Sequence, residues 1–72
     1  MDMKALELIE NVAEIDFQEV ELFTKSSDFL DRCDIIQVLS KFIEDFKIQE
    51  IIVEMLGDKN YLVRCEACEV LA

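Results

Sequence analysis

Apolar residues recur along this sequence at the three- and four-residue spacing of an α-helix with one buried face. The clearest stripe lies in residues 46–56 and consists of Ile48, Ile51, Ile52, Met55 and Leu56. The segment 28–44 is apolar on two faces, which is typical of a helix between two neighbours. The chain has no proline and a single glycine. The pattern predicts helices at residues 3–14, 16–24, 28–44, 46–56 and 60–71.

Short polar residues stand where these helices are expected to begin. Asp16 is followed by Glu19, and Asp28 by Asp31, with the spacing of residues that cap helix N-termini. Gly57 follows the fourth helix, and we expect it to take the left-handed conformation that ends many helices.

The sequence also contains an internal repeat with a shift of 32 residues. Residues 29–40 align with 61–72, and a weaker copy aligns residues 5–9 with 35–39. The identical pairs are Leu30/Leu62, Arg32/Arg64, Cys33/Cys65, Val38/Val70 and Leu39/Leu71. Such a period is typical of arrays of helix pairs that bury their apolar faces on one another. The prediction is an all-α fold: a short α-solenoid of antiparallel helix pairs, with about two and a half repeats in one domain over residues 1–72.

The segment 55–72 resembles a HEAT repeat, particularly the short variety found in phycobilisome-lyase-like proteins. The matching residues are Leu56, Asp58, Val63, Arg64, Ala67 and Leu71. The resemblance implies that Asp58 lies in the turn within a repeat, that Val63 faces the core and that Ala67 permits close helix packing. It also implies that Arg64, and Arg32 in the earlier copy, tie turns or successive repeats together.

The earlier copy departs from this pattern at Asp31 and Ile35, where the later copy has Val63 and Ala67, so we expect its packing to differ. HEAT repeats form interaction scaffolds, which implies binding to another macromolecule without identifying it.

The chain is strongly acidic, with 17 Asp and Glu against 7 Lys and Arg and a net charge of −10. Such a charge repels phosphate backbones, so we expect no nucleic-acid binding and a basic protein as the partner. The alternative is that acidity only maintains solubility. Charges interrupt every apolar segment, so we expect no membrane span. Three cysteines and the lack of a signal-peptide pattern at the N-terminus predict a cytoplasmic protein.

Cys65 and Cys68 form a C-x-x-C motif, which elsewhere marks zinc and redox sites. Here the only further ligand of this kind is Cys33, and the chain has no histidine. We therefore predict that Cys65 and Cys68 are small buried packing residues that react slowly with thiol reagents, and that the chain binds no metal. The serines have no histidine to activate them, and the Glu44–Asp45 pair is interpreted as a solvated helix end. We expect no catalytic residue, no cofactor and no enzymatic activity.

Equivalent positions in successive repeats should lie side by side on their second helices, which line the binding face in HEAT-like arrays. The predicted binding surface for a basic partner consists of Asp34, Gln37, Glu66 and Glu69. The sequence thus favours a protein–protein interaction scaffold. One alternative is an immunity or antitoxin protein that neutralises a basic toxin.

The last predicted helix has apolar residues on its outer side, where a terminal repeat needs polar ones. These residues are Leu62, Cys65, Cys68 and Leu71. We therefore expect that the repeat domain lacks its C-terminal cap and associates with itself through this helix, as a dimer or larger. A further alternative is that the chain is a fragment or a self-assembling unit of a longer solenoid.

Overall fold

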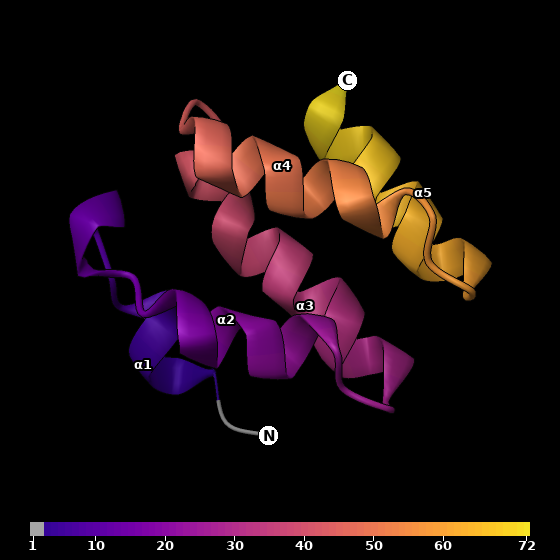
Figure 1. Ribbon diagram of the computed structural model, residues 1–72, viewed down its shortest axis with the longest axis horizontal. Helices are drawn as coiled ribbons and strands as arrows, with labels where there is room; N and C mark the ends of the chain where they lie inside the picture. The colour runs from indigo at the N-terminus through magenta and orange to yellow at the C-terminus, as the bar shows by residue number, and fades with distance from the viewer. Residues whose placement is uncertain (1–2) are drawn as a thin grey trace.

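The computed structural model describes residues 3–72, and this part of the chain is helical without any strand (Figure 1). Its α-helices are α1 (Lys4–Glu7), α2 (Phe17–Thr24), α3 (Phe29–Leu39), α4 (Phe46–Met55) and α5 (Tyr61–Leu71). Two 3₁₀ turns, η1 (Val12–Glu14) and η2 (Ser40–Phe42), follow α1 and α3. The all-α prediction is confirmed for these residues.

Helices α2 to α5 each begin at an acidic or amide side chain that caps the N-terminus. In every case the side-chain oxygen accepts a hydrogen bond from the backbone N–H two residues later. The capping residues are Asp16, Asp28, Asp45 and Asn60. Such a cap satisfies an N–H group that lacks a partner within the helix and contributes about 1 kcal/mol. The predicted caps Asp16 and Asp28 are confirmed.

The predicted helix at 3–14 is wrong, because α1 ends at Glu7 and the chain continues through an irregular segment into η1. Asn11 is the physical reason. Its side-chain oxygen accepts a hydrogen bond from the N–H of Ala13 at 2.9 Å, so it begins a new turn instead of continuing the old one. The β-branched residues Ile9 and Val12 on either side also favour a helix only weakly.

The prediction for Gly57 is also wrong, since its φ angle is not positive. The backbone N–H groups of Leu56, Gly57 and Asp58 each donate to the carbonyl three residues earlier, at 3.1 Å. This right-handed 3₁₀ winding ends α4 without any left-handed residue.

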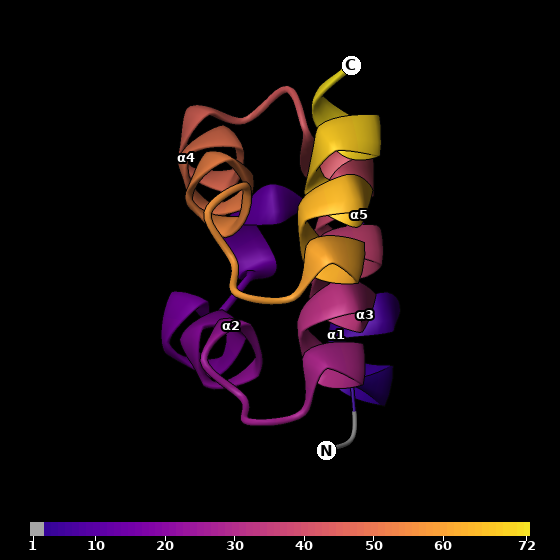
Figure 2. The ribbon, with the colours of Figure 1, turned by 90° about the vertical axis from the view of Figure 1, so that its right-hand side faces the viewer.

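The helices are arranged in two layers, which Figure 2 shows edge-on. Helices α2 and α4 form one layer, and α1, α3 and α5 form the other. Within and between the layers, α3 contacts α2 and α5, and α4 contacts α5. Helix α3 therefore lies between neighbours, as its two apolar faces predict. Whether the layers represent an α-solenoid of antiparallel pairs stays a prediction.

The hydrophobic core lies between the two layers. Its fully buried side chains are Ile35, Ile36 and Leu39 of α3, Ile48 and Ile52 of α4, and Val63 and Ala67 of α5. Helix α2 adds Val20 and Phe23, and Leu6 comes from α1. Because α5 contributes only its inner side to this core, its opposite side faces outward.

Candidate functional site

Arg32 of α3, whose side chain is only 6% exposed, links the α2–α3 turn to the α4–α5 turn. Its Nε donates to Asp58 Oδ2 at 2.9 Å and its Nη2 to Asp58 Oδ1 at 3.2 Å. Its Nη1 donates to the carbonyl oxygen of Ser26, in the α2–α3 turn, at 2.7 Å. Two parallel bonds to one carboxylate are the strong geometry for an arginine ion pair. Arg32 thus connects its own turn to the turn between α4 and α5.

Asp58 is the acidic half of this link. Burial raises the pKa of its carboxyl group, but the hydrogen bonds from Arg32 and from the N–H of Asn60, together with the charge of Arg32, outweigh burial. The net result is a pKa below the ordinary value of an aspartate. Asp58 is therefore ionised in the folded protein and holds Arg32 by charge as well as by hydrogen bonds.

Arg64 repeats part of this arrangement 32 residues later. Its Nη1 donates to the carbonyl oxygen of Asp58 at 2.6 Å, just as Arg32 donates to that of Ser26. Ser26 and Asp58 are themselves 32 residues apart, so the sequence repeat has a structural counterpart. The two arginines differ in burial, because Arg32 is buried and Arg64 is exposed.

The predicted binding residues lie on two neighbouring helices, and we call them the acidic ridge: Asp34 and Gln37 of α3 with Glu66 and Glu69 of α5. The amide Nε2 of Gln37 donates to Glu66 Oε2 and so connects the two helices. Asp34, Gln37 and Glu69 are exposed, and Glu66 is half-buried. The structure therefore brings Gln37 and Glu66 together and leaves Asp34 and Glu69 in solvent.

The predicted self-association residues lie on α5 as well. Leu62, Cys65 and Cys68 are exposed, while Leu71 is half-buried and packs against the core. The prediction that Cys65 and Cys68 are buried is wrong. Within residues 3–72, helix α5 has neighbours only on the side of α3 and α4. Val63 and Ala67 occupy that side, so the two thiols point outward.

Cys33 is different from the other two thiols, since it is half-buried on α3. Burial, followed by the negative charges of Glu66 and Asp34, raises the pKa of the Cys33 thiol. A raised pKa reduces the fraction of reactive thiolate at neutral pH. Across residues 3–72, no three His, Cys, Asp or Glu side chains come together as a metal site would require.

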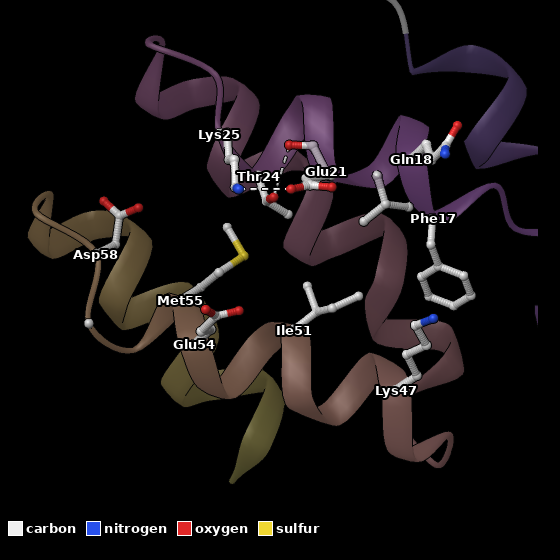
Figure 3. Close-up of a pocket in the computed structure, with 12 residues that line it drawn as sticks. Phe17, Gln18, Glu21, Thr24, Lys25, Lys47, Ile51, Glu54, Met55 and Asp58 are labelled. Atoms are coloured by element: carbon white, nitrogen blue, oxygen red, sulfur yellow. Dashed lines mark hydrogen bonds and ion pairs between the residues drawn. The ribbon is translucent and has the colours of Figure 1, made fainter.

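A groove of about 590 Å³ between α2 and α4 is a feature that the sequence did not single out (Figure 3). Its apolar wall includes Phe17, Val20, Ile51 and Met55. Two lysines of the lining make contacts with residues of α2. Lys25 Nζ forms an ion pair with Glu21 Oε1 at 2.7 Å, and Lys47 Nζ lies 4.5 Å from the centre of the Phe17 ring. The apolar spacing in α2 and α4 predicts that these helices pack against the core. It does not predict the distance between the two helices, and that distance is what leaves the groove.

None of the helices in the described part of the chain is long and apolar enough to cross a membrane. The sequence contains no histidine, the side chain whose ordinary pKa lies nearest to neutral pH. The surfaces of this part present exposed carboxylates on the acidic ridge and exposed Leu62, Cys65 and Cys68 on the outer side of α5.

Comparisons with protein-family models, with curated proteins and with solved structures gave no match. The HEAT-repeat resemblance therefore rests on the residues quoted above and stays a prediction.

Proposed function

We propose that this chain is a protein–protein interaction module that binds a basic partner through the acidic ridge and performs no catalysis. The observation that carries the proposal is the contact between Gln37 and Glu66, which joins α3 and α5 along the ridge. Because the two helices are in contact, the carboxylates of Asp34, Glu66 and Glu69 belong to one surface. A basic protein could meet several of them at once.

Electrostatics supports a basic partner. The chain carries a net charge of −10, and the exposed carboxylates of Asp34 and Glu69 have no opposing ammonium or guanidinium within ion-pair distance among residues 3–72. Such a surface attracts a cationic protein over about 10 Å at moderate ionic strength and raises the association rate more than the affinity. Binding through the ridge should therefore weaken steeply as salt is added.

A charge-reversal experiment with a matched control tests this proposal. The ridge variant replaces Asp34, Glu66 and Glu69 by Lys. The control variant replaces the exposed Glu14, Glu50 and Glu54, which lie outside α3 and α5, by Lys. Each substitution changes the charge by +2, so both variants go from −10 to −4.

The measurement is capture of basic proteins on the immobilised chain at low and high ionic strength, with helix content checked by circular dichroism. We expect the ridge variant to lose capture and the control to keep most of it. Equal losses in both variants would show that only the net charge matters, and the ridge would then not be the binding site.

A further inference from the structure

Helices α3 and α5 present equivalent faces that differ in what covers them. On α3 this face consists of Arg32, Cys33 and Ile36, of which Ile36 has no exposed surface and Arg32 is 5% exposed. The equivalent residues 32 positions later are Arg64, Cys65 and Cys68, and all are exposed. In both helices the third residue of the set lies four positions after the first and three after the second, so it neighbours both on the helix surface.

The α4–α5 hairpin is what covers this face on α3. Asp58, in the turn of this hairpin, binds Arg32. Glu66 of α5 forms a hydrogen bond with Gln37, and its negative charge raises the pKa of the Cys33 thiol. The contact thus combines an apolar surface with one ion pair at the turn. Helix α5 carries the equivalents of the α3 residues in this contact, namely Arg64, Cys65 and Cys68.

Arg64 is already positioned to receive a carboxylate. Its Nη1 is held by the carbonyl of Asp58, as that of Arg32 is held by the carbonyl of Ser26. In Arg32 the remaining donors, Nε and Nη2, bind the carboxylate of Asp58. For Arg64 no protein acceptor of these two donors lies within residues 3–72. A guanidinium with two parallel donors matches the two oxygens of a carboxylate.

We propose that the outer side of α5 is a docking surface for a helical hairpin of a partner protein that carries an aspartate in its turn. Arg64 binds the aspartate, and the side chains of Cys65 and Cys68 pack against the second helix of the hairpin, as Cys33 and Ile36 of α3 lie on the face that α5 covers. This surface adjoins the acidic ridge on α5, since Cys65 and Glu69 are four residues apart, but it takes an acidic group at Arg64 where the ridge takes basic ones. A second copy of this chain does not offer such a hairpin, because α4–α5 is already packed on α3 and Asp58 already binds Arg32.

The chain supplies its own probe for this surface. A copy of residues 41–72 is joined directly after Ala72, with serine in the copy at the two positions equivalent to Cys65 and Cys68. In this register the added aspartate follows Arg64 by 26 residues, which is the separation of Arg32 and Asp58. The labelling rates of Cys65 and Cys68 with a maleimide are then compared between the extended and the original chain.

We expect the added hairpin to slow labelling of Cys68 by about tenfold or more, since it would cover this thiol as α4–α5 covers Ile36. Labelling of Cys65 should slow less, since its equivalent Cys33 stays half-buried. Replacing Arg64 by Met, or the added aspartate by asparagine, should restore most of the original rate. Unchanged labelling in the extended chain overturns the proposal. This includes the case in which the added unit stays unfolded, because the outer side of α5 then fails to bind the kind of hairpin that α3 binds.

Two further outcomes count against specific parts of the proposal. If the Arg64→Met variant of the extended chain keeps the protection, Arg64 is not the carboxylate receptor. If sedimentation of the original chain reveals a dimer in which Cys65 and Cys68 are already protected, a second copy occupies the surface and the proposed partner is wrong.

Discussion

Replacing Arg32 by Met tests the link between the two turns most directly. The substitution keeps the length of the side chain and removes the three hydrogen bonds that the guanidinium donates to Asp58 and to the carbonyl of Ser26. It leaves the carboxylate of Asp58, which is 11% exposed, with only the N–H of Asn60 as a donor. Breaking a buried ion pair on one side costs about 3 to 5 kcal/mol.

We expect the lower end of this range, about 3 kcal/mol, because Asp58 lies in a turn and can move toward water. A domain of this size has a free energy of unfolding of only about 5 kcal/mol, so the change removes more than half of it. In a urea titration followed by circular dichroism at pH 7, the midpoint should fall by about 2 to 3 M.

Arg64→Met is the matched control, since it makes the same chemical change at the equivalent position of the next repeat. Arg64 is exposed and donates one hydrogen bond, to the carbonyl of Asp58. Its loss should lower the free energy of unfolding by about 1 kcal/mol or less. Equal destabilisation by the two substitutions would refute the view that burial of the Arg32–Asp58 pair sets its contribution.

The double variant Arg32→Met with Asp58→Asn separates the lost ion pair from the unpaired charge that the single variant leaves. Removing both charges should recover about 1 kcal/mol or more of the loss caused by Arg32→Met alone. If the double variant is as unstable as the sum of the two single variants, the two side chains are not energetically coupled, and the structural link between the turns has no thermodynamic weight.

Three other predictions follow from single residues. Folding lowers the pKa of Asp58, so the contribution of this group to stability is present above its unfolded pKa of about 4. The contribution disappears as the pH falls through the lower pKa of the folded state. In thermal melts, the Asp58→Asn variant should therefore lose less stability than the original chain between about pH 5 and pH 2. Mass spectrometry after brief maleimide treatment at pH 7 should find Cys65 and Cys68 labelled well before Cys33, and equal rates would contradict their different burial. Gly57→Ala should raise the free energy of unfolding by about 0.4 to 1 kcal/mol in urea titrations, since the added Cβ would lie 3.6 Å from the carbonyl of Glu54 at a φ that is not positive; a decrease would mean that the turn requires glycine.

The accuracy of the sequence-based predictions depends on how local their causes are. Helices α2 to α5 begin within a residue or so of the predicted positions, because a capping side chain and a three- to four-residue apolar spacing act within one turn. The predicted helix at 3–14 fails for an equally local reason, namely the cap that Asn11 provides for a new turn. A glycine after a helix does not fix the backbone conformation there, since a helix can end in a right-handed 3₁₀ turn as well as in a left-handed residue. Gly57 takes the right-handed form.

The acidic ridge was predicted from the repeat, because equivalent positions on stacked helices come to lie side by side. The contact between Gln37 and Glu66 joins residues 29 positions apart and not equivalent residues 32 apart. It places α3 and α5 side by side, and the pairing of equivalent positions stays a prediction. The groove between α2 and α4 was not predicted, because periodicity indicates which residues are apolar and not how far apart two helices pack.

The sequence by itself determined that this chain is helical, where most of its helices begin, and that two of its segments are copies. It also contains the same motif twice, as Leu30-Asp31-Arg32-Cys33 and as Leu62-Val63-Arg64-Cys65. Only the tertiary structure decided that the first arginine is buried in an ion pair and the second exposed beside two accessible thiols. The reason is that burial is set by the neighbouring helices. Helix α3 has α5 as a neighbour on a side where α5 has none among residues 3–72.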